Sequence, residues 1–253
     1  MIQMMKPPIN IMGGKSRLRK EIISMIPNHV CYVEPFFGAG WVYFRKKVSE
    51  VEVINDKDQE LINLFRIIKE HPEELERILR YEFVSRDKFD FYKKIDTNYL
   101  TDIQRAARYL YIVSNSFASK GVSFGYGALK KPSQKIFLED FKILRDRLKN
   151  TYVENKDVLD IINRYDRENT FFFCDPPYYK TTGYLEKFIE EDHIKLKDAL
   201  ENISGKFLLT INDHEKIREL YKNFNIKETK VNYSVSRQTA ARKEYGELII
   251  TNY

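Results

Sequence analysis

The sequence contains little cysteine: Cys31 and Cys174 are the two in 253 residues. Two cysteines cannot form a disulfide framework or a four-cysteine zinc site. The four histidines, at positions 29, 71, 193 and 214, lack the spacing of metal ligands. We therefore expect no metal cofactor and a reducing, cytoplasmic location.

Long apolar runs are also missing. No stretch reaches the roughly 18 consecutive apolar residues of a membrane-spanning helix, and the first residues lack the apolar core of about 7–15 residues found in signal peptides. Ten glycines and eight prolines are too few for a fibrous or low-complexity chain. The 17 tyrosines and 17 phenylalanines supply the apolar surface that disordered chains lack. These observations predict a folded protein without membrane association or export.

Positive charge is unevenly distributed. The chain has 43 basic and 37 acidic residues, and residues 101–150 hold 10 basic and 4 acidic ones, an excess equal to the net charge of +6. Residues 231–243 contain Arg237, Arg242 and Lys243 and no acidic residue. Such segments are often only solvated surface, but two of them are also typical of a protein that binds a polyanion. Composition alone leaves both interpretations open.

Short apolar runs rich in aromatic and β-branched residues alternate with helical patterns. Several runs are continuously apolar, as in strands buried on both faces. The pattern therefore predicts an α/β fold, a sheet with helices on both faces. The predicted strands are 32–34, 51–55, 152–154, 171–174, 207–211 and 248–251, and the predicted helices outside the central region are 15–26, 40–47, 186–202 and 215–223.

The central region has a different pattern. Between residues 58 and 148, apolar residues such as Leu61, Leu64, Phe65 and Ile68 recur at helical spacing. One interruption, residues 119–131 (SKGVSFGYGALKK), has the composition of an exposed loop or hairpin. We interpret residues 57–150 as a mostly helical insertion in an α/β domain formed by residues 1–56 and 151–253.

An Asp-Pro-Pro-Tyr segment, Asp175–Tyr178, directly follows the predicted strand at 171–174. A strand that simply ends at proline would explain the two prolines, because proline cannot continue a ladder. It would not explain the aspartate and the tyrosine, which lie where α/β sheets bind ligands, at the carboxyl end of a strand. Because proline fixes φ, nearby carbonyl groups point in a set direction and can accept hydrogen bonds from an amino group.

A second segment, Glu34–Gly40 (EPFFGAG), follows the first predicted strand. It is either a plain tight turn or a loop that lets a ligand approach the backbone. Tyr43 occupies the third glycine position of the dinucleotide fingerprint, so that motif is excluded. Asp56 ends the next apolar run, where an acid commonly binds ribose hydroxyls, although a helix N-cap is nearly as good an interpretation. The spacing around Gly14-Lys15-Ser16 excludes a phosphate-binding P-loop.

Six segments together resemble the Dam-like DNA adenine-N6 methyltransferases, in that family's order. They are Met12–Lys15, Glu34–Gly40, Ile54–Asp56, Asn155–Asp157, Asp175–Tyr178 and Glu247–Tyr253. The similarity extends over nearly the whole chain. It implies a Rossmann-like methyltransferase sheet, S-adenosylmethionine as methyl donor, double-stranded DNA as partner, and an inserted helical target-recognition domain, which coincides with residues 57–150.

The resemblance also implies which residues bind the cofactor. Lys15 would contact the methyl donor, the turn at 36–40 its methionine part, Asp56 its ribose and Asp157 its adenine amino group. From the residues alone, Lys15 and Asp157 would be interpreted as a solvated helix charge and a helix cap. The implied cofactor residues are Met12, Lys15, Glu34, Phe36, Phe37, Gly38, Gly40, Asp56, Asp157 and Asp175.

The resemblance likewise implies that Asp175 and the Pro176 carbonyl hold the target amine, with Tyr178 stacked on the target base. Adenine's exocyclic nitrogen is a poor nucleophile because its lone pair is delocalised into the ring. Two acceptors that bind both amine hydrogens favour a pyramidal nitrogen whose lone pair can attack the methyl group. The target atom lies inside the duplex, so the base must be flipped out of the helix. This chemistry requires no metal.

The basic segments then become candidate DNA contacts. Those near residues 101–150 would follow the phosphate backbone and reach base edges, and those near the last strand would contact DNA separately. The candidates are Arg105, Ser119, Lys120, Ser123, Tyr126, Lys130, Lys131, Lys135, Arg237, Gln238, Arg242 and Lys243.

Two departures from the family limit the resemblance. Ile11 and Met12 stand where an aromatic residue usually precedes Gly-Gly-Lys, and the Arg-Tyr-Asn run of the members that read GATC is missing. We therefore carry over adenine methylation from the family but not its GATC target, and the recognition sequence stays open. The alternatives are methylation of RNA adenine or of cytosine N4, and a DNA-binding relative without catalysis. A restriction endonuclease partner is left open, and a monomer is expected because the core helices leave no apolar stripe over.

Overall fold

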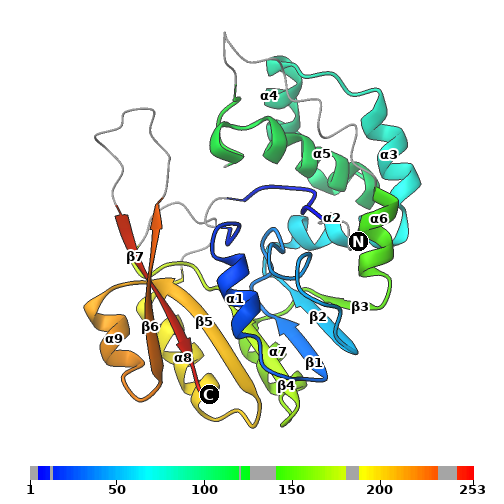
Figure 1. The fold of residues 1–253 in the computed structure, drawn as a ribbon. Coiled ribbons are helices and arrows are strands. Elements are labelled where there is room, and N and C mark those ends of the chain that lie inside the picture. The colour runs from blue at the N-terminus through cyan, green and yellow to red at the C-terminus, as the bar shows by residue number, and fades with distance from the viewer. Residues whose placement is uncertain (1–4, 12–13, 120, 126–140, 181–187, 233–243) are drawn as a thin grey trace. The chain divides into compact units, whose positions relative to one another are not determined.

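The computed structural model describes residues 5–11, 14–119, 121–125, 141–180, 188–232 and 244–253 (Figure 1). The chain divides into two compact units. The sheet unit consists of Arg17–Phe37, Lys47–Asn55 and Lys156–Tyr253. The helical unit consists of Met1–Ser16, Gly38–Lys46 and Asp56–Asn155, so each unit is assembled from three separate stretches of chain.

The sheet unit contains six strands in the order β2-β1-β4-β5-β7-β6. Strands β2, β1, β4 and β5 run parallel, whereas β7 is antiparallel to both of its neighbours. All five residues of β4 are buried, which explains its continuously apolar sequence. The bounds are β1 Cys31–Glu34, β2 Val51–Asn55, β4 Thr170–Cys174, β5 Lys206–Asn212, β6 Asn225–Asn232 and β7 Glu244–Thr251.

The strand register brings several chain segments to one edge of the sheet. Val33 pairs with both Val53 and Phe172, and Cys174 pairs with Leu209, so the four parallel strands end at the same edge. The antiparallel β7 passes this edge near its start, where Glu247 lies opposite Asn212. Ligands of open α/β sheets bind outside the carboxyl ends of the strands, and the Asp-Pro-Pro-Tyr segment begins here.

Helices cover both faces of this sheet. Ile161, Leu196 and Ile217, from three helices, pack in one core with alternate strand residues such as Phe172 and Leu209. In Figure 1 helix α1 lies in front of the strands, whereas α7 and α8 lie behind them. The arrangement confirms the Rossmann-like α/β sheet with helices on both faces. The helices are α1 Arg19–Met25, α7 Val158–Tyr165, α8 Glu190–Glu201 and α9 Glu215–Leu220.

The helical unit is built around α2 and α5, whose buried faces pack on each other. Thr101 and Gln104 form a capping box at the start of α5, and Asp58 caps α2 by accepting from two backbone amides. The elements are α2 Gln59–Glu70, α3 Pro72–Arg80, α4 Arg86–Lys94, α5 Asp102–Asn115, α6 Phe141–Leu148, short 3₁₀ turns at Thr97–Tyr99 and Phe117–Ser119, and the strand β3 Thr151–Glu154.

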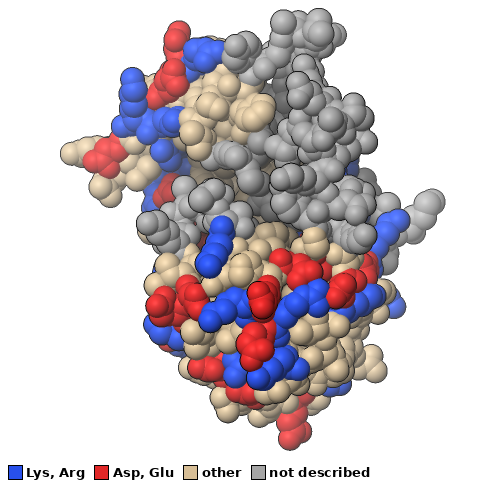
Figure 2. Space-filling model, turned by 90° about the vertical axis from the view of Figure 1, so that its left-hand side faces the viewer, with Lys and Arg blue, Asp and Glu red and all other residues tan. Residues whose placement is uncertain are grey.

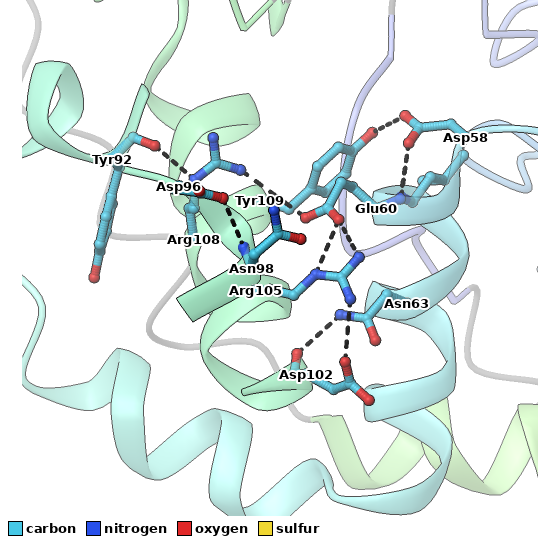
Figure 3. A network of polar contacts seen from close by, with 11 residues as sticks. Asp58, Glu60, Asn63, Tyr92, Asp96, Asn98, Asp102, Arg105, Arg108 and Tyr109 are labelled. Carbon is cyan, nitrogen blue, oxygen red and sulfur yellow. Dashed lines mark hydrogen bonds and ion pairs between the residues drawn. The ribbon is translucent and has the colours of Figure 1, made fainter. Parts of the chain in front are cut away.

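A polar network links α2 and α5 (Figure 3). Arg105 donates to Glu60 through Nε at 3.0 Å and also pairs with Asp102. Tyr109 Oη donates to Asp58 Oδ2 at 3.1 Å, so the residue that caps α2 also bonds to α5. Burial raises the pKa of Tyr109, which stays a hydrogen-bond donor at neutral pH. The two helices are thus joined by ion pairs and hydrogen bonds as well as by apolar packing.

The six strands predicted from the sequence are present. The strand predicted at 51–55 coincides with β2, four others have ends shifted by one residue, and 248–251 is the second half of β7. Strand β6 was not predicted, and the predicted helix at 40–47 is wrong, because the structure has turns there. The helical pattern of residues 57–150 corresponds to α2–α6, but the helical unit also includes Met1–Ser16 and Gly38–Lys46.

Candidate active site

The Asp-Pro-Pro-Tyr segment leaves β4 directly after the buried Cys174. Asp175 is half-buried, and its Oδ1 accepts a hydrogen bond from Thr210 Oγ1 at 3.0 Å. Thr210 lies on the neighbouring strand β5 and is fully buried. The buried hydroxyl therefore holds one carboxylate oxygen of Asp175 at the carboxyl end of the sheet.

The two tyrosines after the prolines are held from β5 and β7. Tyr178 Oη donates to Glu247 Oε1 at 2.6 Å. The backbone amide of Tyr179 donates to Asn212 Oδ1 at 2.8 Å, and its carbonyl accepts from Asn212 Nδ2 at 3.2 Å. The half-buried Tyr178 is consequently fixed at its hydroxyl and next to its backbone.

The segment after β1 is organised by Asn55, the last residue of β2. Asn55 Nδ2 donates to the carbonyl oxygens of Pro35 at 2.9 Å and Lys156 at 3.1 Å, and its Oδ1 accepts from the Lys156 amide at 2.8 Å. The amide of Phe37 donates to the Asn55 carbonyl at 2.8 Å. One buried side chain thus connects the Glu-Pro-Phe-Phe segment to the residue before Asp157.

Three further residues of the sheet unit that the sequence predicted as cofactor contacts each bind a different protein group. Glu34 is buried and accepts from Tyr32 Oη at 2.7 Å. Phe36 is half-buried and meets Phe188 edge to face, with 5.7 Å between ring centroids. Asp157 is exposed and caps α7 by accepting from the Leu159 amide at 2.9 Å. The helix cap that the sequence offered as the plainer interpretation of Asp157 is therefore present.

In the helical unit, Gly38 and Gly40 have φ values of +50° and +74°, which side chains rarely adopt. Asp56 Oδ2 accepts from the Gly38 amide at 2.8 Å, and its Oδ1 accepts from the Asp58 amide at 3.0 Å. Burial raises the pKa of Asp56 to about 6, because the charged carboxylate loses solvation. The same acid therefore binds both the glycine turn and the residue that caps α2. The alternative that Asp56 is itself a helix N-cap is wrong, because the N-cap of α2 is Asp58.

Lys15 is buried in the helical unit, and Met12 lies outside the described residues. The buried Lys15 contradicts the interpretation of a solvated helix charge. Among the described residues, no group of three or more His, Cys, Asp or Glu side chains is arranged so that it could hold a metal ion. Burial also raises the pKa of the Cys174 thiol, which therefore stays protonated and is no nucleophile at neutral pH.

Of the predicted DNA contacts, Arg105, Ser119 and Ser123 fall on described residues. Arg105 is engaged by Glu60 and Asp102, a placement that favours a structural role. The loop after α5 is closed by an isolated bridge between Ser116 and Phe124, and within it the Phe117 amide donates to the Ser123 carbonyl at 2.8 Å. The remaining nine lie outside the described residues: Lys120, Tyr126, Lys130, Lys131, Lys135, Arg237, Gln238, Arg242 and Lys243.

One face of the sheet unit shows interspersed basic and acidic side chains (Figure 2). Around α9 and β6, Arg218 pairs with both Asp213 and Glu228 at 2.7 Å. Because basic and acidic side chains alternate on this face, it lacks the concentrated positive charge of a surface that binds a polyanion.

Four residues that hold the predicted site residues in place were not predicted from the sequence: Asn55, Thr210, Asn212 and Glu247. Two of them could have been found from the sequence, because Asn55 and Glu247 belong to segments that carry the family resemblance. Their neighbours were singled out as ligand contacts, whereas a residue that binds only protein groups leaves no signal in a motif.

No helix of the described chain has the length and apolarity required to cross a membrane.

Comparison with known proteins identifies the family. The model of the D12 class N6 adenine-specific DNA methyltransferases matches residues 12–235. The type II methyltransferase M1.LlaDCHI of Lactococcus lactis subsp. cremoris is 27% identical, over 95% of this chain and 93% of its own length. The DNA adenine methylase of Escherichia coli strain K12 is 25% identical, over 94% of this chain and 91% of its own.

A viral relative has a comparable identity over a smaller share of the chain. The type II methyltransferase M.CviBI of Paramecium bursaria Chlorella virus NC1A is 26% identical, over 87% of this chain and 88% of its own. The family match covers most of the chain, including the Asp-Pro-Pro-Tyr segment and the glycine turn. The chain therefore belongs to the D12 class of N6 adenine-specific DNA methyltransferases, enzymes that take their methyl group from S-adenosylmethionine.

Proposed function

We propose that this chain methylates the N6 amino group of an adenine flipped out of duplex DNA, within one short recognition sequence. The observation that carries the proposal is the Asp175 carboxylate, fixed by the buried Thr210 hydroxyl and followed by two prolines and Tyr178. This is an acceptor group at the edge where α/β sheets bind ligands, next to an aromatic ring. It suits a planar base that carries an exocyclic amine.

The catalytic assignment follows from the acceptors in this segment. The Asp175 carboxylate and the Pro176 carbonyl would accept the two amine hydrogens, and Tyr178 would stack on the base. The nitrogen lone pair forms the new N–C bond, and Asp175 can accept the proton that the nitrogen releases. S-adenosylmethionine, when bound, would supply the electrophilic methyl group; its S–CH3 bond would break, with the electron pair left on sulfur and S-adenosylhomocysteine as the leaving group. Positioning of the two reactants can contribute roughly 7–11 kcal/mol of barrier reduction.

The glycine turn fits a bound cofactor. At Gly38 no atom lies within 4 Å of the position that a Cβ would occupy, so the backbone is open to a ligand. Its amide is bonded to Asp56, whose carboxylate can accept further hydrogen bonds from ribose hydroxyls. We assign Lys15, Gly38, Gly40 and Asp56 of the helical unit to the cofactor, together with Met12.

The sheet unit would supply Glu34, Phe36, Phe37, Asp157 and Asp175 to the same cofactor. Glu34 is bonded to Tyr32 and Asp157 caps α7, so each would have to bind the ligand in addition to its present partner. Phe36 is half-buried and keeps part of its ring accessible.

We assign DNA recognition to residues 57–150. The closed loop after α5 supports this assignment, because Phe117 and Val122 in it are 62% and 65% exposed. Exposed apolar side chains such as these are suited to contact bases. The basic residues predicted around it would bind phosphates, with the exception of Arg105, which is already paired with Glu60.

The cellular setting belongs to the same proposal. We infer an intracellular enzyme that acts as a monomer, since one copy of the chain contains both the acceptor segment and the predicted recognition region. Two of the relatives are named type II methyltransferases, which supports a restriction endonuclease as a partner of this chain too.

The proposal is tested by methyl transfer from labelled S-adenosylmethionine to unmethylated duplex DNA and, in parallel, to RNA. We expect label in DNA with the wild type and none with Asp175→Ala. Asp213→Ala is the matched control, because Asp213 binds Arg218 on the α9 side of the sheet unit. Transfer to RNA alone, or full activity of Asp175→Ala, would refute the proposal.

A further inference from the structure

A buried acid lies beside the acceptor segment and has no assigned role. Glu247 is 2% exposed and belongs to β7, where it lies opposite Asn212 of β5. Its Oε1 accepts a hydrogen bond from the Tyr178 hydroxyl at 2.6 Å. Burying a carboxylate is costly unless it is hydrogen-bonded, so the position calls for an explanation beyond core packing.

Glu247 is one of three neighbouring groups that hold the acceptor segment. Thr210 donates to Asp175, and Asn212, two residues further along β5, bonds to both the amide and the carbonyl of Tyr179. Glu247 completes the set from the adjacent strand by binding Tyr178. The segment is therefore fixed at its acid, at its aromatic ring and at the backbone just after the ring.

The contact with Glu247 determines where the Tyr178 ring can lie. A tyrosine ring can rotate about two side-chain torsions, and its half-buried environment does not by itself select one orientation. A bond from the hydroxyl to a carboxylate is directional and stronger than one between neutral groups. With Tyr179 fixed by Asn212, both ends of the Tyr178 side chain are restrained.

We propose that Glu247 is a positioning residue for the methyl transfer reaction: by binding the Tyr178 hydroxyl, it holds the ring in the orientation in which the ring stacks on the flipped adenine. The inference rests on the proposed function, because it assumes that Tyr178 contacts the base. Glu247 acts through Tyr178 and touches neither reactant. Its removal should therefore impair the use of DNA and leave the affinity for S-adenosylmethionine unchanged.

The test compares Glu247→Leu, Glu247→Gln, Tyr178→Phe and the double variant Tyr178→Phe with Glu247→Leu. Turnover, KM for DNA and binding of S-adenosylmethionine are measured for each, and base flipping is followed by the fluorescence of 2-aminopurine at the target position. Glu228→Gln is the control, because Glu228 lies on β6 with a side chain that is 69% exposed and pairs with Arg218. Thermal unfolding confirms that each variant is folded.

We expect Glu247→Leu to lower kcat/KM for DNA and the flipping signal by about tenfold or more, the size expected for a hydrogen bond to a charged group. Glu247→Gln keeps an acceptor oxygen and should lose less. In the Tyr178→Phe background the change at Glu247 should add no further loss, because the bond it removes is already absent. Should Glu247→Leu not fold, Glu247→Gln and Tyr178→Phe carry the same comparison.

Two results would overturn the inference. One is that the wild type methylates DNA and a folded Glu247→Leu variant flips the base and methylates DNA equally well. The other is an undiminished loss from Glu247→Leu in the Tyr178→Phe background, which would show that Glu247 acts by another route. A wild type that binds S-adenosylmethionine but transfers nothing to DNA would instead refute the proposed function, and the inference with it.

Discussion

Thr210 Oγ1 of β5 donates a hydrogen bond at 3.0 Å to Oδ1 of Asp175, the residue that directly follows the neighbouring parallel strand β4. The threonine is fully buried, so its hydroxyl does not exchange this partner for solvent. The bond orients the carboxylate that the proposed reaction requires. A residue of β5 therefore controls the geometry of the acceptor segment that follows β4.

Replacement of Thr210 by valine removes the hydroxyl and keeps the shape. We expect kcat for DNA methylation to fall about tenfold to hundredfold, because a hydrogen bond to a charged group contributes roughly 1.5–3 kcal/mol. Binding of S-adenosylmethionine, measured by calorimetry, should be unchanged. Thr170→Val is the matched control, since Thr170 is equally buried but lies at the opposite end of β4 and donates to Tyr165. Equal losses in both variants would mean that the Thr210 bond has no specific role.

Asn55→Ala should weaken cofactor binding more than DNA binding. The variant loses the bonds to Pro35 and Lys156 that connect the Glu-Pro-Phe-Phe segment to the chain before Asp157. We expect KM for S-adenosylmethionine to rise while KM for DNA stays the same, with a stability cost of about 1–3 kcal/mol for the buried groups left unpaired.

Asn63→Ala separates the effect of Asn55 on the cofactor from general destabilisation. Asn63 is also buried and donates to Asp102 in the helical unit. Its replacement should lower the unfolding temperature and leave KM for S-adenosylmethionine unaltered. An unchanged KM in Asn55→Ala would contradict the positioning role.

Cofactor binding should weaken as the pH falls through about 6. Burial raises the pKa of Asp56 to about 6, so the group that we assign to the ribose takes up a proton in this range. The protonated acid is a weaker acceptor than the carboxylate. Calorimetric titrations from pH 8 to 5 should show the loss of affinity, and Asp56→Asn should bind weakly at every pH. A wild-type affinity that is constant down to pH 5 would exclude Asp56 from the ribose contact.

The raised pKa of Asp56 has the opposite effect on folding stability: cofactor affinity should fall at low pH, whereas the contribution of Asp56 to stability is largest there. The folded state holds the Asp56 proton up to a higher pH than the unfolded chain, whose aspartate has the ordinary pKa of 3.8. Asp56 therefore contributes stability at low pH, and this contribution is lost as the pH rises from about 4 to 6. Asp56→Asn should remove this part of the pH dependence of unfolding in urea.

His193 should make the sheet unit sensitive to acid. It is buried on α8 between Tyr179 and Phe188, and neither ring nitrogen has a hydrogen-bond partner among the described residues. Burial lowers its pKa to about 4, whereas nearby Asp192 and Glu190 act to raise it. The unfolded chain takes up the proton near pH 6.5 and the folded one near 4, so stability falls as the pH drops between these values.

His193→Phe should flatten the loss of stability between pH 6.5 and 4, measured by urea unfolding. His71→Phe is the control, because His71 is an exposed residue at the start of α3. An equally steep loss in His193→Phe would show that other groups cause the acid sensitivity.

The sequence predicted the parts of the fold whose residues are continuously apolar. Strand β4 is such a run and is buried throughout, whereas β6 (NIKETKVN) has two apolar residues, Ile226 and Val231, among polar and charged ones and lies at the edge of the sheet. The helix predicted at 40–47 fails for a related reason. Val42, Tyr43 and Phe44 are apolar and buried, but they lie in consecutive turns, and an apolar run does not by itself distinguish a buried turn from a helix.

In the candidate site, the sequence predicts the residues of the Asp-Pro-Pro-Tyr segment but not the residues that hold this segment in place. Asp175 and Tyr178 stand in a recognisable segment with residue types that suit an amine and a base. Thr210 and Glu247 become neighbours of that segment only through the pairing of β4 with β5 and of β5 with β7. Strand order and register arise from the whole fold, so a single motif does not reveal them. Arg105 shows the converse, because its charge suggested DNA whereas its partner is Glu60.

The proposed function is tested most directly by the position of the methyl group on DNA after reaction with the wild-type protein and S-adenosylmethionine, read at base resolution. We expect N6-methyladenine within one short sequence and none with Asp175→Ala. Methylcytosine, or methyl groups on RNA alone, would contradict it.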